Sequence, residues 1–212
     1  MTPISFASSS HSVYQRRWFN DCEKAGLAPL TFNEHHLSRE EKEGNFGERG
    51  YGFWFWKPLI IKKALEMEDK IVYTDVDYRI LDMKKLEIML DASQRGLVIF
   101  SYPFQNRIWT KRDCFVYMNC DNAKHWNTPH LEAGVSLWRK TPHTKAFLEE
   151  WSHYCADRRI LSDDPNVCGL PNLPEFRDHR HDQSVLTNLK EQYGIGAVPI
   201  HFLRGVIDGS DI

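Results

Sequence analysis

The residues most suited to chemistry are two carboxylates that follow a predicted buried strand. Ile71, Val72 and Tyr73 form a short β-branched and aromatic run, and Asp75 and Asp77 come shortly after it. In extended backbone this spacing puts both side chains on one face, with Cα atoms roughly 7 Å apart. If a bend brings the carboxylates to about 4 Å, they repel by roughly 4 kcal/mol at an effective dielectric constant of about 20. A divalent cation removes that repulsion, and hard oxygen ligands suit Mg²⁺ or Mn²⁺; the alternative is a solvated Asp-x-Asp turn.

An aromatic segment precedes this strand. Residues 49–58 read R-G-Y-G-F-W-F-W-K-P, and the two glycines allow the backbone to approach a ligand closely. Rings such as Tyr51 and Trp54 would then stack on a base or a sugar, although a core role is the interpretation we prefer for Trp54 and Trp56. Lys57 directly precedes a helix that Pro58 opens, so its ammonium would meet a phosphate at the positive end of that helix.

A serine loop near the N-terminus is another candidate contact. Ile4–Ala7 has the pattern of a short buried strand, and Ser8, Ser9 and Ser10 follow it. In open α/β sheets ligands bind at the carboxyl ends of strands, which makes this loop a candidate nucleotide contact. The serines also suit the N-cap of a helix over residues 11–25, and one loop can perform both roles.

A further chemical cluster lies late in the chain, where residues 177–189 read R-D-H-R-H-D-Q-S-V-L-T-N-L. Asp182 and Gln183 lie near the start of an amphipathic helix, where the helix dipole favours an anion. The functional interpretation places Asp182 at a reaction centre. The structural alternative is an N-cap.

Composition limits the possible classes of protein. With 212 residues, of which 42% are hydrophobic and 26% charged, the chain suits one globular domain. A net charge of −2 gives no electrostatic case for a nucleic-acid partner, and no apolar run approaches the roughly 18 residues of a membrane span. We also expect no signal peptide. Five scattered cysteines without metal-type spacing indicate free thiols in a reducing cytoplasm.

Hydrophobic periodicity predicts alternating strands and helices, and therefore an α/β domain. Further strands are expected over residues 27–32, 97–101 and 131–140, the last with a small-residue break at Ala133-Gly134, and in a final strand that ends at His201. Helices are expected over residues 11–25, 58–69, 82–92, 110–118 and 141–155. A polar loop is expected over 119–130, and an irregular, proline-containing segment over 156–174.

Five motifs, taken in order, resemble one family. They are I-S-F-A-S-S-S at residues 4–10, G-Y-G-F-W-F-W-K-P at 50–58, Y-T-D-V-D at 73–77, L-E-A-G-V-S-L-W-R-K-T at 131–141 and H-R-H-D-Q-S-V-L at 179–186. Together they resemble the nucleotide-diphospho-sugar glycosyltransferases of the GT-A fold, and more closely the small bacterial transferases associated with surface polysaccharides. The resemblance covers most of the chain and is specific for fold and enzyme class, but not for the sugar.

The resemblance implies one Rossmann-like GT-A domain over residues 1–212, with a mixed, mostly parallel sheet flanked by helices. It implies a hexosyltransferase that uses Mn²⁺ or Mg²⁺, a UDP- or GDP-linked sugar donor, and a saccharide or lipid-linked surface-glycan acceptor. Peripheral contact with a membrane is compatible with such an acceptor. The expected location is the cytoplasm.

The resemblance also implies roles for individual residues. Asp75, Asp77 and His201 would hold the metal, and Asp182 and Glu132 would act on the sugar or the acceptor. His201 rests on H-F-L-R-G at 201–205, which is similar to a late segment of glycogenin-like retaining transferases; Val206 follows in place of their Lys-Pro-Trp, so we prefer a surface histidine as the alternative. Donor contacts are expected from Ala7, Ser8, Ser9, Tyr51, Trp54, Lys57, Asp75, Gly134 and Gln183.

Two other functions stay open at this point. One is a phosphohydrolase in which an aspartate of the D-x-D pair is the nucleophile, although such enzymes usually carry the motif on their first strand. The other is a non-catalytic module that binds a nucleotide sugar. Turnover of a panel of nucleotide sugars would separate this module from a transferase.

Overall fold

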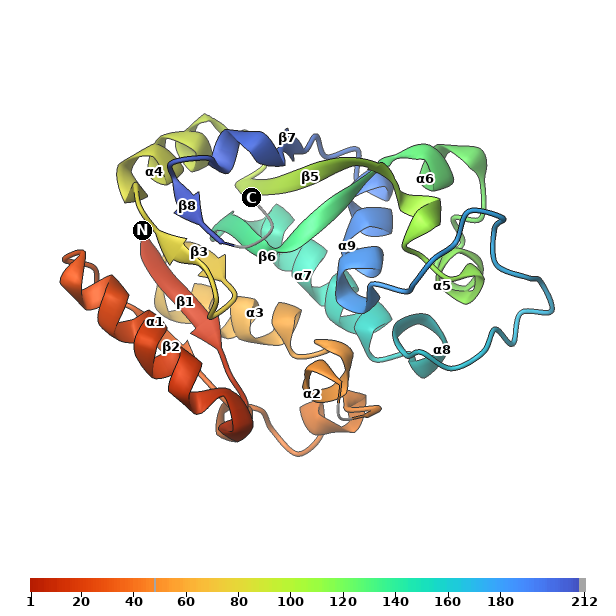
Figure 1. Cartoon of the computed structure of the whole chain (residues 1–212), viewed down its shortest axis with the longest axis horizontal. Coiled ribbons are helices and arrows are strands. Elements are labelled where there is room, and N and C mark those ends of the chain that lie inside the picture. The colour runs from red at the N-terminus through yellow and green to blue at the C-terminus, as the bar shows by residue number, and fades with distance from the viewer. Residues whose placement is uncertain (48, 210–212) are drawn as a thin grey trace.

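A computed structural model describes residues 1–47 and 49–209 of the chain. Within these residues six strands form one sheet in the order β2-β1-β3-β6-β5-β7 (Figure 1). The pairs β2-β1, β1-β3 and β5-β7 are parallel, and β3-β6 and β6-β5 are antiparallel. The strands are β1 (Thr2–Phe6), β2 (Leu30–Phe32), β3 (Lys70–Thr74), β5 (Leu97–Gln105), β6 (Pro129–Arg139) and β7 (Val198–Pro199).

Helices cover both faces of this sheet, as the prediction of an α/β fold requires. One face is covered by α3 (Lys57–Met67), α7 (Pro142–Cys155) and α9 (His181–Gln192), and α7 packs against the other two. The other face is covered by α1 (Ser12–Lys24) and α4 (Met83–Ala92) (Figure 1). The prediction of a mixed, mostly parallel sheet flanked by helices is confirmed.

Alternation along β3 explains how its apolar run is used. Ile71 and Tyr73 are buried in the core that also holds α3, α7 and α9. Val72 points to the opposite face and is buried with Leu86 and Leu90 of α4. A strand that is buried on both faces reads as a continuous apolar run, because neither set of side chains reaches water.

The sheet topology brings three predicted segments to one edge. Since β1 and β3 are parallel, Ala7 and Asp75 both follow strands that end at this edge. β6 runs antiparallel to β3, with Thr74 opposite Val135, and the amide of Asp75 donates to the carbonyl of Gly134 at 2.8 Å. Ligand sites form at such strand ends, where backbone and side chains from several segments converge.

The remaining elements are short. A small two-stranded sheet pairs β4 (Arg79–Ile80) with β8 (Ile207–Asp208). The other α-helices are α2 (Gly50–Phe53), α5 (Arg112–Tyr117), α6 (Ala123–Asn127) and α8 (Arg158–Leu161), and the 3₁₀ turns are η1 (Ser9–His11), η2 (Glu34–His36), η3 (Glu41–Gly44), η4 (Asn106–Ile108) and η5 (Ile200–Leu203). No helix in the described ranges is both long and apolar enough to cross a bilayer.

Several sequence predictions of local structure are wrong. The strand predicted to end at His201 stops at Pro199, which has no N–H to continue a ladder, and η5 follows. The polar segment 119–130 contains α6, which Asn122 caps by accepting from the amides of Lys124 and His125. The segment 156–174 contains α8, which Asp157 caps in the same way. Short capped helices carry too little periodicity to be recognised.

Candidate active site

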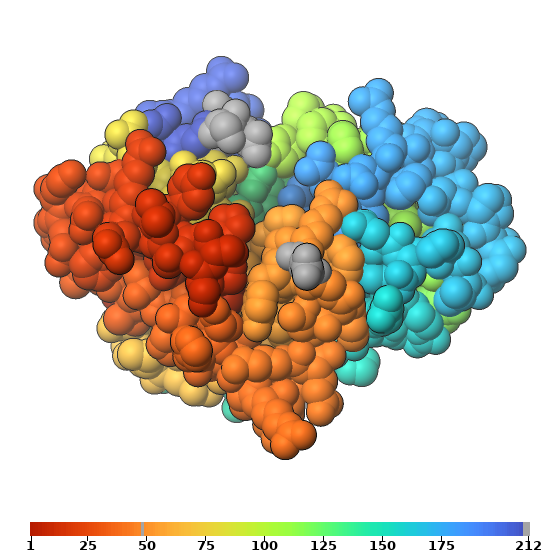
Figure 2. Space-filling model, turned by 60° about the horizontal axis from the view of Figure 1, so that its bottom comes forward, coloured from red at the N-terminus to blue at the C-terminus, as the bar shows by residue number. Residues whose placement is uncertain are grey.

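Two neighbouring cavities open at the carboxyl end of β3. The first has a volume of about 860 Å³ and the second about 440 Å³. Both are lined by Trp54, Asp75 and Asp77, so the predicted acidic pair lies where the two meet. Figure 2 shows the orange segment around residue 50 between the red N-terminal segments and the cyan and blue C-terminal ones. The combined size of the two cavities is enough for a ligand with two separate parts, since small-molecule sites span roughly 300–1,000 Å³.

The serine loop forms one wall of the first cavity. Ala7, Ser8 and Ser9 line it, as predicted for a nucleotide contact. The amide of Ser9 donates to Glu34 Oε1 at 3.0 Å, and the Ser9 hydroxyl donates to the same oxygen. The capping interpretation is not supported, because neither Ser8 ahead of η1 nor His11 ahead of α1 makes a side-chain cap bond.

The aromatic segment has an unusual backbone. Tyr51, Phe53 and Trp54 have φ angles of 47°, 63° and 59°, in the left-handed region that non-glycine residues seldom adopt. Such strained residues cluster at functional sites, where the surrounding packing fixes them. Trp56 is buried and stacks on Phe6 at 3.9 Å, as a core residue should. Trp54 is only partly buried and lines both cavities, so the preferred core role does not describe it fully.

Lys57 lies at the floor of the second cavity, with only 2% of its surface exposed. Its Nζ donates to the carbonyl of Ala133 at 3.1 Å and lies 3.3 Å from Asp182 Oδ2 and 3.5 Å from Asp75 Oδ1. Burial disfavours its charge, but the surrounding carboxylates outweigh burial and raise the pKa of Lys57. Lys57 was predicted to contact a phosphate, but in the structure its charge is already engaged by carboxylates.

More acid than base is buried in this cluster. Asp182 and Glu132 are both buried, and Asp75 is partly so. Burial raises the pKa of Asp182 to about 7, against the opposing charge of Lys57. Burial likewise raises the pKa of Glu132, although Tyr102 and the amide of Gly134 donate hydrogen bonds to its two oxygens. One lysine cannot balance three carboxylates, so the cluster holds a proton close to neutral pH.

A bulge in β6 delivers Glu132 and Gly134 to the cavity. The register between β5 and β6 shifts between Ile99 and Phe100, which leaves residues 133–135 of β6 without partners in β5. The predicted small-residue break is therefore confirmed, and bulges are known to aim side chains at sites. A Cβ added to Gly134 would lie 2.6 Å from Glu132 Oε1 and 2.7 Å from the Tyr78 ring, so only glycine fits.

Helix α9 positions Asp182 and Gln183. The helix begins at His181, whose φ of 46° is left-handed, and its N-cap position is Arg180, which makes no side-chain cap bond. Asp182 is therefore not the N-cap that the structural alternative required. Its backbone carbonyl accepts from Trp151 Nε1 at 3.2 Å, and its side chain turns toward Lys57. Gln183 lines the same cavity.

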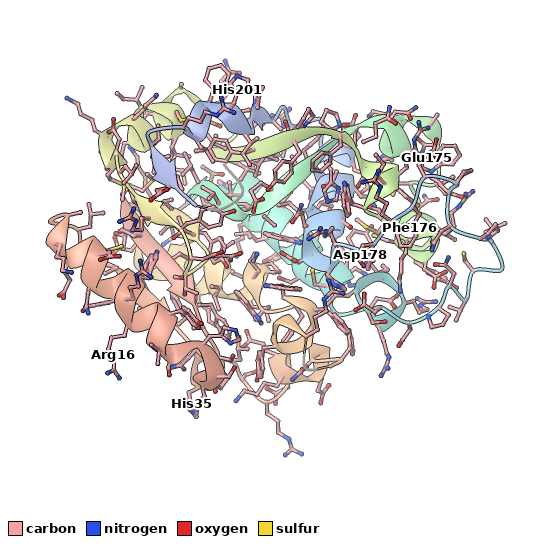
Figure 3. All side chains as sticks on the ribbon, viewed as in Figure 1. Arg16, His35, Glu175, Phe176, Asp178 and His201 are labelled. Atoms are coloured by element: carbon pink, nitrogen blue, oxygen red, sulfur yellow. The ribbon has the colours of Figure 1, made fainter. Side chains whose placement is uncertain are left out.

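His201 is the one predicted site residue that the structure leaves apart. It is exposed on η5, lines neither cavity, and lies at the outer edge of the molecule (Figure 3). Within the described residues no group of three or more His, Cys, Asp or Glu side chains is placed to hold a metal. The predicted residues that line a cavity are Ala7, Ser8, Ser9, Tyr51, Trp54, Lys57, Asp75, Asp77, Glu132, Gly134, Asp182 and Gln183.

The acidic pair fits a metal that arrives with a phosphate ligand. Mg²⁺ usually takes one or two carboxylates from a protein and the rest of its oxygens from substrate phosphates and water. Asp75 Oδ1 is engaged by Lys57 and by the Tyr73 hydroxyl, whereas Oδ2 lies near Gly134, which lines the second cavity. Asp77 is exposed at the junction of the cavities.

The outer wall of the second cavity was not predicted from the sequence. Tyr102 and Phe104 on β5, Trp109 after η4, His130 on β6 and Arg180 before α9 all line it. Tyr102 and Phe104 alternate in a strand that continues beyond Ser101, and this alternation would have indicated that both rings share one face. The predicted strand ended at Ser101, so both rings fell outside it.

The sequence and the structure were compared with those of known proteins. No protein-family model and no curated protein matches the sequence. The structure is similar to that of an active-site mutant of LgtC, with a TM-score of 0.50, 14% identity, and coverage of 94% of this chain and 72% of that chain.

Other similar structures score lower. One is mouse xyloside xylosyltransferase 1 in its apo form, with a TM-score of 0.48, 12% identity, and coverage of 94% of this chain and 85% of that chain. Another is a glycosyltransferase involved in glycosylation of the major capsid of PBCV-1, with a TM-score of 0.39, 14% identity, and coverage of 72% of this chain and 64% of that chain. The chain thus spans less than two thirds of the length of the PBCV-1 protein. On the likeness to LgtC, the chain has the GT-A glycosyltransferase fold that its motifs predicted.

Proposed function

We propose that this protein transfers a sugar from a nucleotide-diphosphate donor to a saccharide or other glycan acceptor. The observation that carries the proposal is the meeting of two cavities at Asp75 and Asp77, beside a buried cluster of Lys57, Asp182 and Glu132. Transfer needs two adjoining sites, one for each substrate, with polar groups at the reacting carbon between them. The GT-A fold supports this choice over the phosphohydrolase.

The first cavity is the proposed donor site. Its aromatic side, with Tyr51 and Trp54, offers faces on which a base can stack. Its serine loop carries exposed hydroxyls, at Ser9 and Ser10, whose present partners a ligand oxygen can replace. UDP- and GDP-linked sugars both satisfy this description. The diphosphate would then lie toward Asp75 and Asp77, at the junction with the second cavity.

Asp77 and Asp75 Oδ2 are the proposed ligands of a Mn²⁺ or Mg²⁺ ion. When bound, such an ion would stabilise the negative charge of the leaving nucleoside diphosphate. Asp182 and Glu132 then face the sugar and the acceptor, where a carboxyl group with a pKa near 7 can accept or return a proton at a sugar hydroxyl. Lys57 holds both Asp75 and Asp182 in place.

Three further parts of the proposal rest on the sequence. Residues 1–212 would form a single glycosyltransferase domain that builds surface polysaccharide, and the protein would act in the cytoplasm. Free cysteines accord with a reducing compartment, since all five lack a disulfide partner. Contact with a membrane surface would come from a lipid-linked acceptor.

The test is binding of nucleotides by the wild type and by Asp77→Asn. A ligand that binds only the folded protein raises its melting temperature according to its affinity, so UDP and GDP are added with and without Mn²⁺. We expect a Mn²⁺-dependent rise in the wild type, and a loss of at least about tenfold in affinity in the variant. Asp91→Asn, an exposed carboxylate on α4, is the matched control and should bind as the wild type does.

Either of two results contradicts the proposal. Equal Mn²⁺-dependent binding by wild type and Asp77→Asn would remove the metal assignment. Nucleotide-sugar binding without any transfer or hydrolysis of the donor would favour the non-catalytic module.

A further inference from the structure

The outer wall of the second cavity is aromatic. The rings of Tyr102 and Phe104 stack with centroids 4.7 Å apart and an interplanar angle of 13°. The Phe104 and Trp109 rings are 5.7 Å apart and tilted by 58°. All three side chains are partly exposed and line the cavity. This wall can bury the apolar face of a pyranose ring, which the carboxylates at the cavity floor cannot do.

Arg180 stands on this wall. Its guanidinium carbon lies 4.6 Å from the centre of the Trp109 ring, and its amide donates to the Trp109 carbonyl at 3.0 Å. The side chain is exposed and forms no ion pair with any residue in the described part of the chain. A guanidinium stacked on an indole is held in one orientation, with its N–H groups still available.

The other cations of the cavity are already engaged. Arg49 lies 3.0 Å from Asp163 and 3.4 Å from Asp178, which Figure 3 shows in the loop before α9. Lys57 is surrounded by carboxylates. Arg180 alone among the three lining cations therefore has its charge available for a ligand, within the residues that the structure describes.

The charge of Arg180 acts inside the cavity as well as at its mouth. Burial lowers the pKa of His130 to about 3, and the positive charge of Arg180 adds to this effect. His130 is therefore neutral and does not compete with Arg180 for an anion. The floor of the same cavity holds Asp75, Asp182 and Glu132, which repel an anion.

We propose that the acceptor is a saccharide carrying an anionic group, a carboxylate or a phosphate, which Arg180 binds while the sugar ring lies on Tyr102, Phe104 and Trp109. This inference rests on the proposed function, because it names the acceptor class for the same site. The anionic group is drawn to Arg180 and driven from the acidic floor. A hydroxyl at the other end of the sugar is thereby turned toward Asp182 and Glu132, where transfer takes place. The guanidinium fork matches both carboxylate and phosphate oxygens in bidentate geometry.

The test compares three glycosides that differ only at carbon 6: methyl β-D-glucoside, methyl β-D-glucuronide and methyl β-D-glucoside 6-phosphate. Binding to the wild type, without nucleotide, is measured by ligand-observed NMR titration at low salt. We expect one of the two anionic glycosides to bind at least about 10-fold more tightly than the neutral one, which equals about 1.4 kcal/mol. Whichever anion is preferred identifies the source as a uronate or a sugar phosphate.

Arg180→Gln should abolish the preference, and Arg180→Lys should retain only part of it, because a lysine keeps the charge without the planar fork. Arg177→Gln is the matched control, since Arg177 is an exposed arginine three residues away that lines neither cavity. The control should keep the full preference. Circular dichroism verifies that each variant is folded.

Two outcomes overturn the inference. One is equal binding of all three glycosides by the wild type, including no binding of any. The other is an anion preference that survives in Arg180→Gln. The proposed function is tested separately by nucleotide binding with Mn²⁺, so a protein that binds nucleotide without this preference would lose only the inference. A protein that shows the preference but binds no nucleotide would lose the proposed transferase activity.

Discussion

The two cavities that meet at Asp75 and Asp77 are built in different ways. The first is made largely from two continuous stretches, the serine loop after β1 and residues 50–56 of the aromatic segment. Hydroxyls of serine and tyrosine are the most numerous of its polar groups, beside the carboxylates of Glu34, Asp75 and Asp77. The second takes its side chains from β5, β6, α3, the loop after β3 and the start of α9. It buries one lysine among three carboxylates.

The first cavity therefore presents mainly exposed, neutral groups to a ligand, whereas the second contains buried charges that depend on one another for stability. Neutral hydroxyls at an open surface exchange one hydrogen bond for another, so changing one of them costs little. Buried charges in low dielectric are each expensive unless paired, so the second cavity depends on every member of its cluster. Substitutions in the two cavities should therefore affect stability very differently.

The largest effect is expected from Lys57→Met. This change leaves Asp75, Asp182 and Glu132 without their shared cation. Removing one partner of a buried ion pair costs about 3–5 kcal/mol, so the free energy of unfolding should fall by that amount in urea denaturation. Transfer activity should be lost as well.

Two controls sharpen the Lys57→Met comparison. Lys62→Met removes a partly exposed lysine of the same helix, 3.8 Å from Glu149, and should change stability by no more than about 0.5 kcal/mol. Ser9→Ala in the first cavity should also cost under about 1 kcal/mol, since its hydroxyl is exposed. A loss below about 1 kcal/mol in Lys57→Met would show that the buried cluster is not held by this lysine, and the contrast between the cavities would fail.

A pH-dependent effect is expected from Asp182→Asn. The pKa of Asp182 is raised to about 7 in the folded protein, from about 3.9 in an unfolded chain. Between these values the folded state holds a proton that the unfolded state has released. The stabilisation is therefore complete below about pH 4 and is lost as the pH rises through about 7.

Asparagine cannot titrate, so the variant lacks this pH dependence. The free energy of unfolding of the wild type minus that of Asp182→Asn should decrease by up to about 4 kcal/mol between pH 4 and pH 7, since each pKa unit is about 1.36 kcal/mol. A constant difference over this range would show that Asp182 is ionised throughout. In kinetics the variant should lower turnover far more than donor affinity, as expected for a group that acts in the transition state.

The smallest of the three effects is expected from Gly134→Ala. The added methyl group meets the Glu132 carboxylate and the Tyr78 ring, so it should cost about 1–3 kcal/mol and displace Glu132. Gly196→Ala is the control, because a Cβ there has no neighbour within 4 Å among the described atoms. Equal stability of both variants would mean that the β6 bulge adjusts freely, and Glu132 would then be only loosely placed.

Most of the fold followed from local patterns. Apolar runs predicted β1, β3 and β6, and helical periodicity predicted α1, α3, α4 and α7, because long elements repeat their pattern several times. The elements that prediction missed include α6 and α8, which a single cap residue sets up, the short strands β4 and β8, and η5 after Pro199. None of these has enough residues for a period to show.

The site was predicted in its parts and not in its assembly. Asp75, Lys57 and Asp182 each stood out from neighbouring residues alone, and each does line a cavity. That they contact one another did not follow, because 107 positions separate Asp75 from Asp182 in the sequence. Lys57 shows the consequence: its local position indicated a phosphate contact, whereas the fold surrounds its ammonium with carboxylates.

Local sequence patterns were enough to identify most of the backbone segments that line the two cavities. They were enough because strand ends, glycines, prolines and helix starts act through neighbouring residues only. Tertiary structure alone decided which charges are buried together, which cation keeps its charge available, and that Tyr102, Phe104 and Trp109 form a wall. Those properties depend on distances across the sheet and on the loss of solvent, and neither is set by any one segment.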